Sequence, residues 1–167
     1  ASGATVQLPP CVFRESVTID KPLTLQGPAE IRGSRILNEW TASGGDWVSW
    51  QTQTPQRSTR PGSECGGGPD ALDVDDTCLL LEQIWIDGVY QTQLVDGANP
   101  AAGQFAMNAT NHYVIGTDPT GKVVEAAVRN RWLTVLSDDV TIDTMTFNYV
   151  ANDAKVGKER ALNTNKA

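Results

Sequence analysis

The stretch VTIDKPLTLQGPAEIRG, residues 17–33, decides how the chain is expected to fold. It alternates runs of β-branched and other apolar residues with short segments rich in proline, glycine and aspartate. Very short strands separated by turns predict an all-β fold, because hairpins with long strands would be interrupted less often. The expected strands are Val17–Ile19, Leu23–Leu25 and Glu30–Arg32, with turns at 20–22 and 26–28.

A similar phrase returns near the other end of the chain. Val17-Thr18-Ile19-Asp20 and Val140-Thr141-Ile142-Asp143 are close copies, and Leu133–Leu136 is a further β-type run just before the second copy. Repeated short strands favour a solenoid, in which each coil buries its inward side chains against its neighbours. A β-sandwich also contains many short strands, so this pattern by itself leaves both architectures open.

The middle of the chain has a different composition. Three of the five tryptophans cluster around a glycine-rich turn at Gly44–Asp46, and a polar stretch at 51–76 is typical of a long loop. Strand patterns then resume, with a hairpin signal at Asp87-Gly88. We interpret this region as an antiparallel β subdomain inserted into the solenoid. Its later strands are expected at 79–86, 89–94, 104–107, 112–115 and 123–128.

The charge and the apolar content limit the possible partners. The formal net charge is -7, which disfavours nucleic acid and anionic lipid surfaces. No stretch approaches the roughly 20 apolar residues that span a bilayer, so membrane insertion is not expected. Neutral polysaccharides remain as partners, and acidic ones require a local basic groove.

The three cysteines favour an oxidising compartment. Cys65 and Cys78 bracket a glycine-rich loop, and a disulfide between them would stabilise the fold by about 3 kcal/mol in the chain-entropy model. The alternative is a pair of reduced thiols in a cytosolic protein. Cys11 follows two prolines in an apolar run and is expected to be a small buried residue. We therefore predict a secreted, extracellular protein.

The sequence resembles the N-terminal part of secreted right-handed parallel β-helix repeat proteins, the pectate-lyase-like superfamily. The resemblance covers nearly the whole chain, including a β subdomain inserted near the start of some of these proteins. The segments that carry it are Gly3–Leu8, Phe13–Ile19, Lys21–Gly27 and Ile31–Ser34, then Glu82–Gly88, Gly103–Phe105, His112–Pro119 and Val124–Glu125 in the insert, and finally Val140–Thr146.

The resemblance implies an all-β fold in which right-handed parallel β-helix rungs are interrupted by an antiparallel β subdomain. The expected parts are residues 1–38, the insert at 39–130, and resumed rungs at 131–167. Because residues 151–167 are polar and bring no closing cap, the natural protein is expected to continue, or the open end to meet a like subunit.

The superfamily contains glycoside hydrolases, polysaccharide lyases, epimerases and non-catalytic members, so the resemblance is weak for activity. The catalytic groups of its enzymes generally lie on later rungs. No catalytic residue is therefore predicted here, and the chain is interpreted as a non-catalytic segment of a polysaccharide-active protein. The alternative is a structural module of an extracellular filament or surface layer, which stacks through its open end.

Two groups of residues are candidate binding sites. Trp40, Trp47 and Trp50 could stack on sugar rings, although tryptophans at this density are also typical of a small β core. Four aspartates in the long loop could hold Ca²⁺ and support an adhesion module, although EF-hand spacing is absent and a solvated acidic loop would look the same. The four are Asp70, Asp73, Asp75 and Asp76. No other cofactor is predicted.

Overall fold

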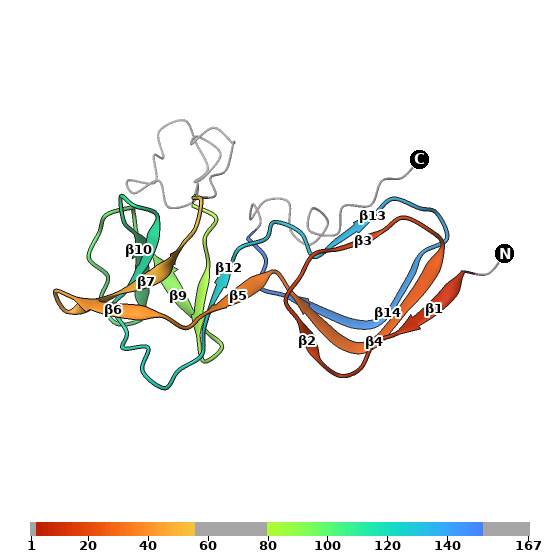
Figure 1. The fold of residues 1–167 in the computed structure, drawn as a ribbon, viewed down its shortest axis with the longest axis horizontal. Helices are drawn as coiled ribbons and strands as arrows, with labels where there is room; N and C mark the ends of the chain where they lie inside the picture. Colours follow the sequence, from red (N-terminus) through yellow and green to blue (C-terminus); the bar gives the residue numbers. More distant parts are fainter. Residues whose placement is uncertain (1–2, 56–79, 152–167) are drawn as a thin grey trace, which may run out of the picture. The chain divides into compact units, whose positions relative to one another are not determined.

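The computed structural model describes residues 3–55 and 80–151, and these residues form an all-β protein (Figure 1). The prediction of an all-β class is confirmed. The chain forms two compact units, one made of residues 1–35 with 127–167 and the other of residues 36–126. No helix in the described residues is long and apolar enough to cross a membrane.

The first unit is built from parallel strands. Its strands are β1 (Ala4–Gln7), β2 (Val12–Phe13), β3 (Val17–Ile19), β4 (Leu23–Arg32), β13 (Leu133–Val135) and β14 (Thr141–Asn148). The long β4 lies between β1 and β14, β2 pairs with its second half, and β3 pairs with β13 (Figure 1). Every one of these ladders is parallel, whereas a β-sandwich is built from antiparallel ones.

Side chains at matching positions of neighbouring strands lie along one core. Leu25 of β4 pairs with Val6 on one side and Ile142 on the other, and Leu25 is the buried residue of the three. Trp132 closes this core, since its ring lies 5.7 Å from that of Phe147 and its Nε1 donates to the Asn148 carbonyl at 2.7 Å. The buried members are Ile19, Leu25, Ile31, Trp132, Leu133 and Val150.

The turn expected at residues 26–28 is wrong, because β4 runs without interruption from Leu23 to Arg32. Neighbouring strands on both sides pair with it and hold it extended. Gln26 Nε2 donates to Asp143 Oδ2 at 2.9 Å, and Gln7 Nε2 donates to the carbonyl of Gly27. Gly27 is required here because a Cβ at this position would collide with the backbone carbonyl of Thr144 in β14.

The second unit carries most of an eight-stranded sheet in the order β5-β12-β8-β9-β10-β11-β7-β6. The chain enters it through β5 (Ser34–Leu37) and leaves through β12 (Val124–Ala127). The other strands are β6 (Trp40–Ser43), β7 (Asp46–Thr52), β8 (Ile84–Ile86), β9 (Val89–Gln93), β10 (Gln104–Met107) and β11 (His112–Ile115).

The expected antiparallel arrangement needs one correction. The β6–β7, β7–β11, β10–β11, β8–β9 and β8–β12 pairs are antiparallel, but β9 and β10 are parallel. The connection between β9 and β10 contains two successive turns, which together restore the chain direction. They are closed by hydrogen bonds from Ala98 N to Val95 O and from Gln104 N to Ala101 O. A single turn would have reversed the chain direction.

The hairpin predicted at Asp87-Gly88 is confirmed. Asp87 and Gly88 have φ angles of 50° and 80°, the two left-handed residues of a type I′ turn, and Ile86 pairs with Val89 across it. The core of this unit contains Phe105 and Tyr113, whose rings meet edge to face at 6.3 Å. Because β7 and β11 are neighbours in the sheet, they position the residues of the candidate site described next.

Candidate functional site

The β6–β7 hairpin places the three predicted tryptophans on two different faces. Trp40 is opposite Ser49 and Ala42 is opposite Trp47, so Trp40 and Trp47 share the face on which Ser49 is buried. Side chains alternate along a strand, so Trp50 points to the other face. The three residues therefore do not form one flat aromatic platform.

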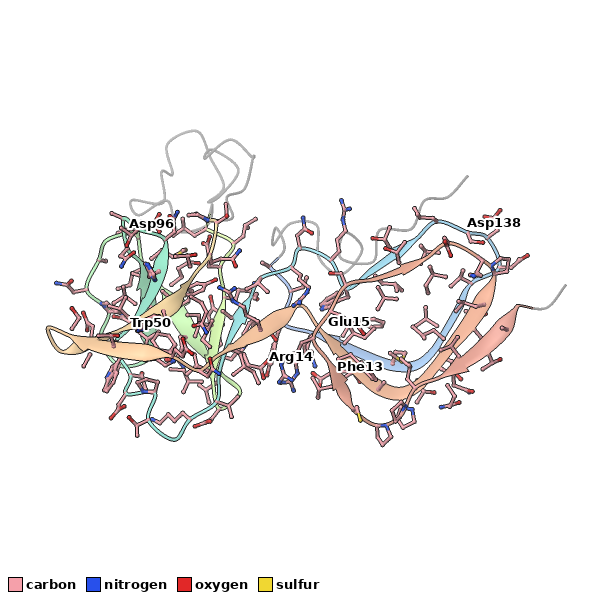
Figure 2. All side chains as sticks on the ribbon, in the orientation of Figure 1. Phe13, Arg14, Glu15, Trp50, Asp96 and Asp138 are labelled. Carbon is pink, nitrogen blue, oxygen red and sulfur yellow. The ribbon has the colours of Figure 1, made fainter. Side chains whose placement is uncertain are left out.

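Trp50 is the exposed member of the three, with 69% of its surface accessible, whereas Trp40 and Trp47 are half-buried. Figure 2 labels Trp50 on the ribbon of the second unit. Its indole Nε1 donates to Thr41 Oγ1 at 3.1 Å, and its backbone N donates to the Glu39 carbonyl at 2.9 Å. A large apolar ring that is both exposed and held by hydrogen bonds presents a contact surface with little conformational entropy left to lose.

A first open hollow of about 470 Å³ lies beside Trp50 and is lined by Asn38, Glu39, Trp40 and Trp50. The Trp40 Nε1 donates to the Leu37 carbonyl at 3.2 Å, which orients that ring at the start of the edge strand. Gln51 Nε2 donates to Asn38 Oδ1 at 3.1 Å. Two indoles thus converge with an amide and a carboxylate, whereas Trp47 does not line this hollow.

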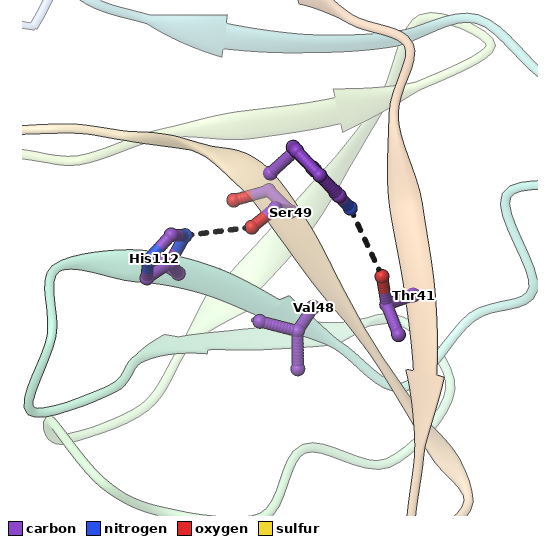
Figure 3. A pocket seen from close by; sticks show the side chains of 5 residues that line it. Thr41, Val48, Ser49 and His112 are labelled. Atoms are coloured by element: carbon purple, nitrogen blue, oxygen red, sulfur yellow. Dashed lines mark hydrogen bonds between the residues drawn. The ribbon is translucent and has the colours of Figure 1, made fainter.

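A second open hollow, of about 250 Å³, also lies beside Trp50 and is formed by residues of β6, β7 and β11 (Figure 3). Its lining is Thr41, Val48, Ser49, Trp50 and His112. The His112 Nδ1 lies 2.7 Å from the Ser49 carbonyl oxygen. A carbonyl only accepts hydrogen bonds, so Nδ1 must carry the hydrogen, and the neutral ring then keeps Nε2 as an acceptor.

A third hollow, of about 490 Å³, lies on the first unit. It extends over the neighbouring strands β2, β4 and β14 and the residues just before β2. It is lined by residues 10–12, 28–30 and 144–146. Cys11 is exposed here, so the expectation that it is buried is wrong. It lies on the connection between β1 and β2, where the backbone pairs with Glu30 N and the side chain remains outside.

Glu30 in this third hollow is held by its neighbours. Arg32 donates to it from Nε at 2.7 Å and from Nη2 at 3.1 Å, and Asn148 Nδ2 donates at 2.8 Å. These hydrogen bonds lower the pKa of the Glu30 carboxyl below its ordinary value of 4.5, and the bond from Arg32 has the largest effect. Arg32 also lies over the Tyr149 ring, 4.7 Å from its centroid.

Glu30→Gln is expected to weaken the dependence of stability on acid pH. A depressed folded-state pKa stabilises the protein above the unfolded-state value, and this contribution is lost as pH falls through the folded-state pKa. The melting temperature of the wild type should therefore fall more steeply than that of Glu30→Gln between about pH 5 and pH 3. If the melting temperatures of the two proteins fell equally across this range, the Glu30–Arg32 pair would contribute nothing to the acid dependence of stability.

The acidic loop and the cysteine pair lie outside the described residues. This applies to the candidate calcium ligands Asp70, Asp73, Asp75 and Asp76 and to the disulfide predicted between Cys65 and Cys78. Among residues 3–55 and 80–151, no three histidine, cysteine, aspartate or glutamate side chains gather as a metal site would require. Both hypotheses therefore stay predictions.

Sequence reasoning missed the polar residues around Trp50. Thr41, Glu39 and His112 have no motif spacing that links them, and His112 meets Ser49 across 63 residues of chain. His112 is the one histidine of the sequence, which argued against histidine-based chemistry but gave no indication of a binding role. Only the pairing of β7 with β11 brings it beside Trp50.

Comparison with known proteins gives a structural likeness. No family model matches the sequence, and no curated protein is significantly similar to it. The solved structure of XylC in complex with xylose matches 90% of this chain with a TM-score of 0.63 and 16% sequence identity. The likeness shows a shared fold. The chain matches 31% of XylC, so it spans under a third of that protein's length.

Proposed function

We propose that this chain is the glycan-binding, non-catalytic N-terminal segment of a secreted right-handed parallel β-helix protein that acts on polysaccharides. The parallel register supports the β-helix part of the proposal. Three neighbouring strands, β1, β4 and β14, pair in parallel in one sheet, and β3 pairs in parallel with β13 in a separate sheet. Stacked parallel strands around one apolar core are the arrangement of a solenoid.

The observation that carries glycan binding is the exposed, oriented ring of Trp50 between two hollows. An indole face suits the C–H face of a pyranose, and amide and carboxylate groups suit its hydroxyls. Asn38 and Glu39 supply such groups beside the ring. XylC binds xylose in its solved structure, and its shared fold makes a carbohydrate the first ligand class to test.

Each of the three described hollows is lined by at most one carboxylate. Glycoside hydrolysis generally requires two carboxyl groups about 5–10 Å apart across the scissile bond. Of the side chains that line the three described hollows, Glu39 is the carboxylate beside Trp50 and Glu30 the one in the third hollow. Glu30 is already engaged by Arg32 and Asn148.

Incubation with plant polysaccharides tests the two halves of this proposal separately. We expect the chain to be retained on insoluble xylan or cellulose, and to release no new reducing ends or unsaturated products into the supernatant. Heat-denatured protein is the control for retention by non-specific adsorption. Robust turnover by this chain would overturn the non-catalytic role, and absence of retention on every neutral polysaccharide would overturn glycan binding.

A second candidate function is a structural module that stacks on another β-coil. The observation that favours it is the outer edge of β14, where Ile142 is 36% exposed although the matching Leu25 is 6% exposed. Among the residues that the structure describes, β14 is the last strand of its sheet, and a strand edge promotes pairing. The occupant that we propose is the remainder of the parent chain or a like subunit. Concentration-dependent light scattering without glycan retention would favour this function over the first.

A further inference from the structure

The hollow beside His112 has a hydrogen-bonding capacity that can be counted atom by atom (Figure 3). Ser49 Oγ donates to the Gln51 carbonyl at 2.9 Å and accepts from Tyr113 N at 3.0 Å, so it is used within the fold. His112 Nδ1 is used by the Ser49 carbonyl. Ser49 therefore shapes the hollow and fixes the imidazole, but it is not the group offered to a ligand.

Two polar groups remain available next to the indole. In the neutral ring with its hydrogen on Nδ1, His112 Nε2 is an acceptor, and no hydrogen bond to it is formed by the residues that the structure describes. Thr41 Oγ1 accepts from the Trp50 indole, which leaves its hydroxyl hydrogen to donate. An acceptor and a donor beside an aromatic ring match a sugar hydroxyl pair, because each hydroxyl can both donate and accept.

The charge of the lining selects among sugars. Thr41, Val48, Ser49 and Trp50 bring no formal charge, and the adjoining hollow contains the carboxylate of Glu39. Among the described lining residues, the carboxylate of a uronic acid would lose water without gaining a lysine or arginine partner, and it would be repelled by Glu39. Both effects are unfavourable. A neutral sugar meets neither obstacle.

We propose that this hollow is a second saccharide subsite, specific for a neutral sugar, in which His112 Nε2 accepts a hydroxyl hydrogen and Thr41 donates one. Trp50 lines both hollows, so the ligand is an oligosaccharide that passes across its ring, not a single sugar. This inference rests on the proposed glycan-binding function and assigns its substrate class and a specificity-determining residue.

The test compares two substitutions of one residue by calorimetric titration with xylohexaose and cellohexaose. The amide nitrogen of His112→Asn can replace Nδ1 as the donor to the Ser49 carbonyl, while the atom corresponding to Nε2 is lost. We expect this variant to keep the wild-type melting temperature and to bind about tenfold more weakly, the loss typical of one hydrogen bond. His112→Gln, whose amide reaches the Nε2 position, should bind more tightly than His112→Asn.

Thr41→Val gives an independent variant of nearly the same volume, which keeps the test decisive if His112→Asn folds poorly. It removes both the proposed donor and the acceptor of the Trp50 indole, so we expect weaker binding, and Thr41→Ser, which keeps the hydroxyl, should retain the affinity. The neutral hexasaccharides should also bind more tightly than hexagalacturonate and at least tenfold more tightly than free xylose.

The outcomes separate the two proposals. If Trp50→Ala loses binding while His112→Asn and Thr41→Val bind like the wild type, glycan binding stands and the second subsite is overturned. Tighter binding of hexagalacturonate, or equal affinity for xylose and xylohexaose, overturns the neutral oligosaccharide class alone. If the wild type binds none of these sugars, the proposed function fails and the subsite fails with it.

Discussion

Trp50→Ala is expected to weaken oligosaccharide binding by about 30-fold or more, the effect of losing a central aromatic contact worth at least about 2 kcal/mol. The ring is 69% exposed, lines both hollows and is oriented by Thr41, so it is the shared element of the proposed site. Because its side chain lies on the outer face of β7, its loss should leave the core intact. Titration calorimetry with xylohexaose measures the effect.

Tyr90→Ala is the matched control for this experiment. Tyr90 is also an exposed aromatic residue of the second unit, with 53% of its surface accessible, and it contacts Trp85 edge to face at 6.1 Å. It lines neither hollow beside Trp50. We expect Tyr90→Ala to bind like the wild type. Equal losses in both variants would mean that aromatic exposure in general, not the Trp50 site, drives retention.

Gly27→Ala is expected to cost about 3 kcal/mol of stability, the upper end of the range for overpacking. A Cβ at this position would meet the carbonyl oxygen of Thr144, and neither backbone can retreat without breaking ladder pairs between β4 and β14. Denaturant unfolding followed by tryptophan fluorescence is a suitable measurement. Trp132 lies in the same unit and reports directly on its core.

Gly44→Ala is the control for the general cost of replacing a glycine. Gly44 has a φ of +64° in the β6–β7 turn, and an added Cβ there would meet nothing within 4 Å. Its replacement should cost about 1 kcal/mol, from the left-handed backbone alone. If Gly27→Ala were no more destabilising than Gly44→Ala, the close approach of β4 and β14 would not be what requires glycine at residue 27.

The acid dependence of Glu30 and the binding variants report on different units, so they can be measured separately. Glu30 belongs to the first unit, whereas Trp50, Thr41 and His112 belong to the second. A glycan ligand that raises the melting temperature should therefore do so equally in the wild type and in Glu30→Gln.

The fold class followed from local patterns, but the strand register did not. Val17-Thr18-Ile19-Asp20 and Val140-Thr141-Ile142-Asp143 are near copies in sequence, yet they are not partners. Val17–Ile19 pairs with Leu133–Val135, and Thr141–Asp143 pairs with Thr24–Gln26. A pattern of period two fits any neighbour with the same alternation, so burial in the assembled core must choose among the possible registers.

The candidate site shows the same division. The sequence indicated Trp50 as a possible sugar contact, but it gave the same role to Trp40 and Trp47, because composition does not say which side of a strand faces solvent. The hairpin register put Trp47 on the face of buried Ser49 and Trp50 on the other. His112 entered the site only through the pairing of β7 with β11.

By itself, the sequence determined that the fold is all-β, where the Asp87-Gly88 hairpin turns and that the net charge is negative, because these depend on neighbouring residues and on composition. The tertiary structure alone decided that β4 continues through Gly27, that β9 and β10 run parallel, and that His112 lies beside Trp50. These features depend on contacts between residues far apart in the chain, whose free energy no local pattern contains.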